Sequence, residues 1–230
     1  MLHASAASPP PIGVPDPNAL WVRDRRVDRT REALRRHGIE SDFVETAGEA
    51  LQYVLDRLPA GAVIGLGGSS TLRQIGLWAA LDHLGATVIN HQLAGLTKAE
   101  RHELRRRGLT SDFYVMSCNA IAETGAIVVL NEAGNAVAAL AFGAKEVVIV
   151  ASTQKLVPTV DAALARAFTE AAPAVAHRSS QLQPPCHEDG VCRESVCDSP
   201  NRLCNKALIL YGEAIPGRVR VLMVGQPLGF

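Results

Sequence analysis

The sequence predicts an α/β protein built on a doubly wound, mostly parallel sheet. Short apolar runs rich in Val and Ile alternate with amphipathic segments along most of the chain, and strands that alternate with helices favour a parallel sheet with helices on both faces. Hydrophobic residues make up 47% of the 230 residues and aromatic residues only 4%, so we expect a core of Ala, Val, Leu and Ile. The length suits one large domain over residues 18–230. The Pro-rich residues 1–17 are predicted to form a disordered tail.

The sharpest turn in this pattern lies at residues 62–71, AVIGLGGSST. An apolar strand ends in glycines, and hydroxyl residues then open a helix. Glycine lets the backbone come close to a ligand, and free N–H groups at a helix start can hold a phosphate or a carboxylate. The spacing matches neither the Rossmann nor the Walker motif, so a plain strand-to-helix turn is the alternative. The residues predicted to bind a small anion here are Gly67, Gly68, Ser69, Ser70 and Thr71.

The other elements follow from apolar periodicity and from helix start and stop signals. Helices are predicted at residues 18–37, 47–58, 70–83, 97–107 and 158–171, and strands at 39–46, 62–66, 86–89, 111–117 and 146–151. Residues 120–130 are predicted to form a hairpin that turns at Thr124-Gly125. Residues 207–211 and 218–224 form either a second hairpin or a pair of terminal strands. The basic residues of 18–37 and 105–107 are interpreted as solvent-exposed surface.

Polar groups follow four of the predicted strands: 67–70, 90–92, 118–119 and 152–155. In a parallel sheet, ligands bind beyond the carboxyl ends of the strands, so these groups are expected to meet at one rim. Asn119 and Lys155 are the further predicted ligand-binding residues, and Lys155 would supply positive charge. His91 either binds the ligand or caps a strand, and the sequence leaves both open.

Two residues near this rim are candidates for catalysis. Glu123 acts as a general base if burial raises its pKa, whereas a solvated hairpin glutamate is the alternative. Cys118 is either a nucleophile at a strand end or an inert buried thiol.

Residues 177–205 form a long polar segment without periodicity, which in a compact domain usually has a function. Four of the five cysteines of the chain, Cys186, Cys192, Cys197 and Cys204, lie in it with the spacing C-x5-C-x4-C-x6-C. Four thiolates suit tetrahedral zinc or an iron–sulfur cluster. The segment lacks the C-x-x-C pair typical of such sites, so a loop of reduced thiols without metal is the alternative.

Composition excludes several classes of partner. The formal net charge is zero, which does not favour nucleic acid or an anionic membrane surface. No apolar run approaches the roughly 18 residues needed to span a bilayer, and the start of the chain lacks the features of a signal peptide. We therefore expect a cytoplasmic protein. The oligomeric state is open.

Several segments together resemble the LUD (lactate-utilization) domain family. They are residues 64–71, 118–125, 131–135, 142–145, 154–157, the cysteine-bearing segment and 225–230. The resemblance extends from about residue 21 to the last residue. It implies a fold like that of the phosphosugar isomerase and CoA-transferase group (NagB/RpiA/CoA transferase-like). In some members it also implies a role in oxidising L-lactate to pyruvate with iron–sulfur partner proteins.

One position departs from the family pattern. Relatives that carry the cysteines tend to have an arginine after the Gly-Asn pair, whereas here Ala136 follows Gly134-Asn135. If that arginine holds an anion, this protein has lost the contact or has transferred it to Lys155.

Three hypotheses follow. The first is a component of lactate or organic-acid oxidation that binds a small anionic ligand and works with iron–sulfur oxidoreductase subunits. The second is a freestanding isomerase or CoA-transferase-like enzyme with Glu123 as base or nucleophile. The third is a non-catalytic, metal-binding assembly subunit that docks an iron–sulfur protein through the cysteine-bearing segment.

Overall fold

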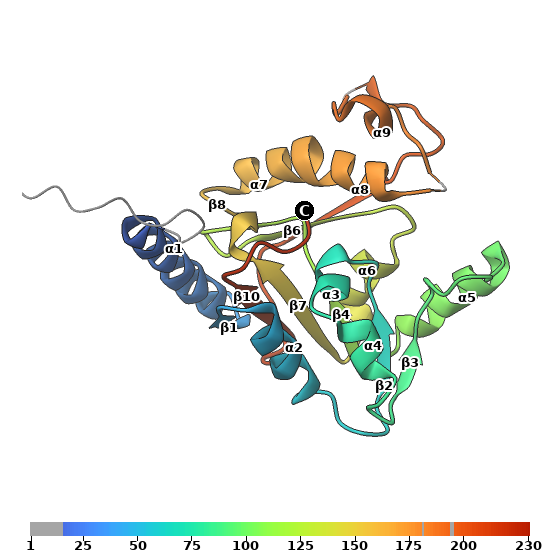
Figure 1. Cartoon of the computed structure of the whole chain (residues 1–230), viewed down its shortest axis with the longest axis horizontal. Helices are drawn as coiled ribbons and strands as arrows, with labels where there is room; N and C mark the ends of the chain where they lie inside the picture. The colour runs from blue at the N-terminus through green and yellow to red at the C-terminus, as the bar shows by residue number, and fades with distance from the viewer. Residues whose placement is uncertain (1–15, 181, 194–195) are drawn as a thin grey trace, which may run out of the picture.

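Two sheets form the centre of the protein in a computed structural model that describes residues 16–180, 182–193 and 196–230 (Figure 1). The strands of the larger sheet are β1 (Glu40–Val44), β2 (Val63–Leu66), β3 (Thr87–Ile89), β4 (Phe113–Met116), β7 (Glu146–Ser152) and β10 (Val219–Val224). Their order is β1-β10-β7-β4-β2-β3, and every neighbouring pair is parallel. The strands of the smaller sheet, in the order β8-β5-β6-β9, are β8 (Leu156–Val157), β5 (Ala120–Ala122), β6 (Ile127–Asn131) and β9 (Lys206–Leu210).

Helices connect most of the strands. The α-helices are α1 (Pro17–Arg36), α2 (Ala47–Leu55), α3 (Ser70–Gln74), α4 (Leu77–Leu81), α5 (Lys98–Gly108), α6 (Asn135–Ala138), α7 (Val160–Arg166), α8 (Ala172–Arg178) and α9 (Cys186–Asp189). Shorter turns are η1 (Ala139–Gly143) and η3 (Ala167–Ala171), both π-helical, and the 3₁₀ turn η2 (Thr153–Lys155). Thr97 and Glu100 form the predicted capping box of α5. None of the helices in the described part of the chain has both the length and the apolar character needed to cross a bilayer.

Side chains of β7 show why helices cover both faces of the larger sheet. Val147 and Ile149 belong to one apolar cluster, which also contains residues of α1, α6 and η1. Val148 and Val150 belong to a second cluster with residues of α2, α3 and α4. Successive side chains of a strand point to opposite faces, so a strand that is apolar throughout must be covered on both sides. The predicted doubly wound α/β fold is confirmed.

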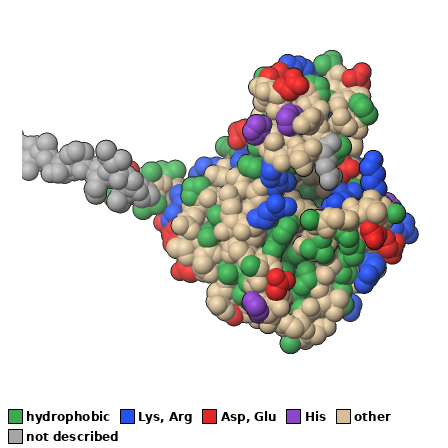
Figure 2. Space-filling view, turned by 45° about the vertical axis from the view of Figure 1, so that its right-hand side comes forward, with side chains coloured by type: hydrophobic (Ala, Val, Ile, Leu, Met, Phe, Trp, Pro, Cys, Tyr) green, Lys and Arg blue, Asp and Glu red, His purple; other side chains and the backbone are tan. Residues whose placement is uncertain are grey.

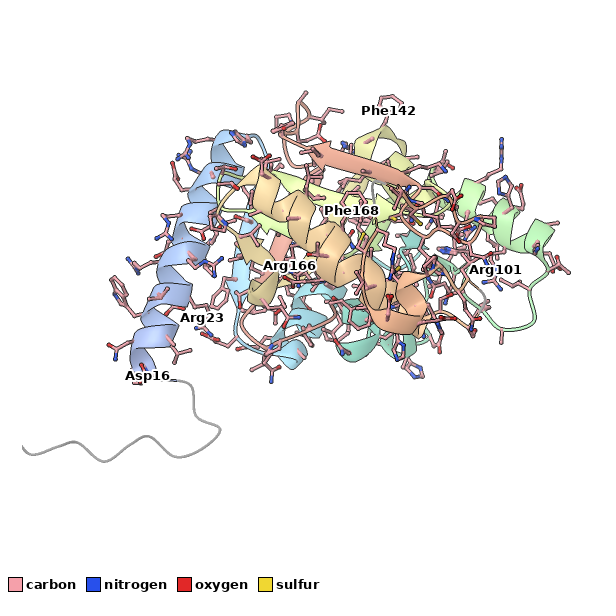
Figure 3. The ribbon with its side chains drawn as sticks, turned by 90° about the horizontal axis from the view of Figure 1, so that it is seen from above. Asp16, Arg23, Arg101, Phe142, Arg166 and Phe168 are labelled. Carbon is pink, nitrogen blue, oxygen red and sulfur yellow. The ribbon has the colours of Figure 1, made fainter. Side chains whose placement is uncertain are left out.

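The smaller sheet forms a further layer. Ile121 and Ile127 join the cluster on the α1 face of the larger sheet, whereas Ala120 and Val128 pack against α7. Seen from above, α7 lies over these strands (Figure 3). The predicted hairpin is confirmed, because β5 and β6 pair antiparallel on either side of Gly125, whose φ is +97°.

Two predicted helices differ in the structure. The helix at 70–83 is divided into α3 and α4 by Gly76, whose left-handed backbone breaks the hydrogen-bond ladder. The helix at 158–171 continues to Arg178, because Pro173 lies in the first turn of α8, where its missing N–H costs little.

The terminal strands do not form a hairpin. β9 pairs with β6 in the smaller sheet, and β10 lies between β1 and β7 in the larger one. Residues 1–15 of the predicted tail lie outside the described residues. Asp16 and Pro17 begin α1, where the Asp16 side chain accepts hydrogen bonds from two backbone N–H groups.

Candidate functional site

A pocket of about 230 Å³ lies where β2, β4 and β7 end. Each of the four polar groups predicted to meet at a rim contributes to its wall. These residues are Gly67, Gly68, Ser69, Ser70, Thr71, His91, Gln92, Cys118, Asn119 and Lys155. The parallel sheet brings them together because all of its strands end at the same edge.

Lys155 is the most buried charged side chain of the pocket wall, with 3% of its surface exposed. Its Nζ donates hydrogen bonds to Thr71 Oγ1 at 3.2 Å, to Ser117 Oγ at 3.0 Å and to the Cys118 carbonyl oxygen at 3.1 Å. No carboxylate of the described residues forms an ion pair with it. The pKa of Lys155 is lowered to about 8, mainly by burial; the charge of Cys118 opposes this shift, and the charge of Arg166 adds to it.

The glycine turn forms the adjoining wall. The Gly67 N–H donates to the Val115 carbonyl oxygen at 2.9 Å, so the sheet already uses it. A Cβ at Gly67 would lie 3.0 Å from Met116 Cβ, and one at Gly68 would lie 1.9 Å from Gln92 Nε2. Ser69 Oγ accepts from the Leu72 N–H at 3.3 Å and caps α3. Close packing against Met116 therefore explains Gly67 without reference to a ligand, whereas at Gly68 the flexible end of Gln92 could move aside.

The residues after β10 cross this wall. The Gly229 N–H donates to Gln74 Oε1 at 2.6 Å, and Gln154 Nε2 donates to the carbonyl oxygens of Leu228 and Gly229, each at 3.2 Å. The φ of Gly229 is +67°, and a Cβ there would lie 2.3 Å from Thr71 Oγ1 and 3.1 Å from Lys155 Nζ. Only glycine fits this position, so the segment 225–230 packs directly over the buried amine.

Two arginines that the sequence analysis did not assign to the site also line the pocket. Arg105 forms an ion pair with Glu132 at 3.1 Å, and its buried Nε has no hydrogen-bond partner among the described residues. Arg178 donates to Ser70 Oγ, and its guanidinium lies 5.6 Å from the ring centre of Phe230. With Lys155, the pocket wall has three cationic side chains and one acidic side chain, that of Glu132.

The interpretation of residues 105–107 as simple surface is therefore corrected for Arg105. The signal in the sequence is the i, i+4 spacing of Arg101 and Arg105, which places both on one face of α5. Arg178 lies beyond residue 171, where the sequence predicts the end of the helix, and it is therefore absent from the predicted site.

A larger groove of about 590 Å³ adjoins the pocket and shares Arg105 and Arg178 with it. Arg73 and Arg101 line the groove as well. Lys and Arg side chains stand on both sides of the hollow below the lobe that carries α9 (Figure 2). Burial first, and then the charges of Arg105 and Arg101, lower the pKa of His91 to about 4, so His91 is neutral at pH 7.

Asn119 lies in the pocket wall and is held there by hydrogen bonds. Asn119 Oδ1 accepts from the Leu130 N–H at 2.7 Å, which fixes the orientation of its amide. Arg166, labelled in Figure 3, donates to the Asn119 carbonyl oxygen from α7. Ala136, the residue that departs from the family pattern, also lines the pocket. The side chain of a longer residue at position 136 would therefore start from the pocket wall, within reach of the pocket.

The structure does not bring Glu123 to the pocket. Its carboxylate pairs with Arg26 and Arg29 of α1, each at 2.7 Å. Burial alone would raise the pKa of Glu123, but the hydrogen bonds and charges of the two arginines outweigh this effect and lower it. A carboxylate held in its ionised form by two cations is a poor proton acceptor, and this arrangement fits a structural role that joins α1 to the β5–β6 hairpin.

Comparison with protein families gives one decisive match: the model of the LUD domain matches residues 27–224. The chain belongs to the LUD domain family. A crystal structure of a DUF162 family protein from Deinococcus radiodurans is 17% identical in sequence, with a TM-score of 0.49, and the alignment covers 88% of this chain and 98% of that one. A comparison with curated proteins found no match.

The cysteines of this LUD-domain chain fall into two environments. Cys118 is buried at the pocket where the strands end, and burial raises its pKa. The other four are partly exposed and together line a separate cavity of about 20 Å³. Within the described residues, no three His, Cys, Asp or Glu side chains are close enough together to hold a metal ion as they stand. The two sites share one wall residue, Leu203.

Proposed function

We propose that this LUD-domain protein binds a small organic acid in the pocket at the strand ends, as a cytoplasmic component of the oxidation of L-lactate or a related acid with iron–sulfur partners. The observation that carries the proposal is Lys155, a buried amine at the pocket wall without a carboxylate partner among the described residues.

The charges of the pocket favour an anion. A buried ammonium group attracts a carboxylate more strongly than an exposed one, because fewer water molecules screen the pair. Arg105 and Arg178 add positive charge at the same wall. The unpartnered Arg105 Nε is a donor that a ligand oxygen would satisfy. The volume of about 230 Å³ suits a ligand of a few heavy atoms.

Support for the lactate setting comes from the family. The chain belongs to the LUD domain family, some members of which act in L-lactate oxidation. Ala136 stands where related chains with the cysteines tend to have an arginine. Lys155 and Arg105 supply positive charge to the same pocket, and we assign the lost contact to them.

Calorimetric titration of the full chain with L-lactate, pyruvate, acetate and inorganic phosphate tests the proposal. We expect saturable binding of a hydroxy or oxo acid that weakens with added salt, as for a charge-dependent contact. Glycerol, which lacks the carboxylate, should not compete. If none of the four anions binds to the folded protein, the proposal is wrong.

The basic groove favours a second candidate, a freestanding isomerase or CoA-transferase-like enzyme. Four arginines along a groove that continues from the pocket suit a ligand with phosphate groups at some distance from its reacting end. Glu123 is not the base in this version, since it pairs with α1. Turnover of an acyl-CoA or a phosphosugar by the purified protein alone would support this candidate, and activity seen only with iron–sulfur partners would support the first.

A further inference from the structure

The surroundings of the Lys155 amine differ from those of a lysine held in an ion pair. Its hydrogen-bond partners are the hydroxyl groups of Thr71 and Ser117 and the Cys118 carbonyl oxygen, all of them uncharged. No Asp or Glu side chain among the described residues pairs with it. A neighbouring carboxylate would hold the ammonium form, whereas a buried site with neutral partners makes the neutral amine easier to reach. Lys155 is therefore placed to act as a nucleophile as well as a cation.

The titratable and charged groups near Lys155 act on its amine in opposite directions. The Cys118 thiol favours the ammonium form and the Arg166 guanidinium favours the neutral amine, but burial has the largest effect, and the pKa is about 8. At pH 7 roughly one molecule in ten then has a neutral amine, against about one in 2,500 for a lysine with the ordinary pKa of about 10.4. The ammonium form, which predominates, attracts the acid, and the neutral form can attack it.

Two hydroxyl groups beside the amine can carry protons. Thr71 Oγ1 and Ser117 Oγ lie 3.3 Å apart, and they lie 3.2 Å and 3.0 Å from Lys155 Nζ. Because a hydroxyl group both donates and accepts hydrogen bonds, these three atoms form a closed path for a proton. Condensation of an amine with a ketone moves two protons from nitrogen to oxygen, and this path serves both transfers.

The pocket also offers groups for the carboxylate of an acid. Arg105 and Arg178 line it together with Lys155, and the Arg105 Nε has no hydrogen-bond partner among the described residues. In a 2-oxo acid the ketone carbon is bonded directly to the carboxylate carbon. An arginine that binds the carboxylate would therefore leave the ketone carbon for the amine of Lys155.

We propose that Lys155 forms a Schiff base with a small 2-oxo acid in this pocket. The inference rests on the proposed function, because it concerns the same pocket and the oxo form of the acid. The amine lone pair attacks the ketone carbon and forms a C–N bond, while the electron pair of the C=O bond moves to oxygen, which takes a proton. The oxygen then takes a second proton and leaves as water as the C=N bond forms. One amine and one ketone give one imine and one water, without an oxidant or a reductant.

Reductive trapping with cyanoborohydride tests the proposal, because it converts an imine into a stable secondary amine. The full chain is incubated with pyruvate and the reductant and then digested, and mass spectrometry identifies the labelled peptides. We expect at least about tenfold more label on Lys155 than on Lys145, which is exposed, since far more of the Lys155 amine is neutral. Absence of label from Lys155, or label spread evenly over it and Lys98, Lys145 and Lys206, would overturn the proposal.

A matched variant separates this inference from the proposed function. Lys155→Arg keeps a positive charge, but a guanidinium does not form the imine. The variant should lose the label and still bind L-lactate in titration calorimetry. L-lactate, which has no ketone, should leave no label on the parent protein. If Lys155→Arg does not fold, the peptide map of the parent protein decides. Binding of pyruvate without label on Lys155 would overturn the Schiff base alone, whereas no binding of any organic acid would overturn the proposed function as well.

Discussion

The pocket at the strand ends and the cavity lined by Cys186, Cys192, Cys197 and Cys204 share Leu203 as a wall residue, yet their residues are held in different ways. Lys155 follows a strand at the centre of the sheet and donates to three acceptors that follow or flank other strands. The cysteines lie in a lobe whose one described helix has four residues. Parallel strand ends therefore fix Lys155 and its acceptors, whereas little regular structure among the described residues holds the cysteines.

The largest expected effect is a loss of affinity for the organic acid at the pocket. Lys155→Met should weaken binding of the organic acid about 10- to 100-fold, since hydrogen bonds to charged groups contribute about 1.5–3 kcal/mol. The control is Lys145→Met, which removes an exposed lysine that pairs with Asp112. Titration calorimetry provides the measurement, and equal affinities for Lys155→Met and Lys145→Met would contradict the role of Lys155.

The second effect is the pH dependence of binding. With a pKa of about 8, Lys155 is mostly protonated at pH 7 and loses its charge as the pH rises through 8. Affinity for the anion should therefore be constant below that value and fall by about tenfold per pH unit above it. His91 does not contribute to this pH dependence, because it is already neutral above about pH 4. Cys118 would gain only negative charge, which does not attract an anion, and burial raises its pKa. A profile that is the same in Lys155→Met would assign the titration to another group.

The third effect concerns the segment that crosses Lys155. Gly229→Ala should lower the free energy of unfolding by about 1–3 kcal/mol, from backbone strain and from contact of the new Cβ with Thr71. Gly217→Ala is the matched control, because its φ is +79° but its nearest neighbour is 3.7 Å away. Urea unfolding gives the free energy of unfolding of both variants, and the difference between their losses measures the contact, because the backbone strain is common to both. Equal losses would mean that the segment does not press on the pocket wall.

The smallest effect is expected at Glu123. Glu123→Gln removes the partner of Arg26 and Arg29 and should lower the free energy of unfolding by about 1 kcal/mol at pH 7, since Arg29 is mostly exposed and water screens that pair. The pKa of Glu123 is lowered in the folded state, so its contribution is complete above the unfolded value of 4.5 and is lost as the pH falls through the folded value. Ligand affinity should not change. A large loss of ligand affinity in Glu123→Gln would show that Glu123 does contribute to ligand binding.

Strand ends can be predicted from the sequence because apolar runs and glycine stops are local signals. Together with the parallel topology, these signals are enough to make Lys155, Asn119 and the residues of the glycine turn neighbours at one rim. The arginines cannot be assigned in the same way. Arg105 belongs to a run of three arginines, which is typical of an exposed helix face. Arg178 lies in α8, which follows the π-helical turn η3 without a break and so extends the helix past Pro173. Their positions depend on how α5 and α8 pack, which is not a local property.

The partners of Glu123 cannot be predicted locally either, since Arg26 and Arg29 are nearly a hundred residues away along the chain. The terminal strands show the same limit. Both are predictable as strands, but β-strand patterns do not specify a partner, and the pairing of β10 with β1 and β7 depends on the whole sheet.

The position of β10 has a consequence for biosynthesis. β1 is an edge strand whose one neighbour in the larger sheet is β10, and the two differ by almost 180 positions in sequence. On the ribosome, β1 is made early and has no partner until residue 224 has emerged, so its backbone hydrogen-bonding groups stay open while the rest of the chain is made. Open strand edges pair with other chains. A chain truncated before residue 219 should therefore expose this edge and aggregate more readily, although every helix among the described residues lies before β10 in the sequence.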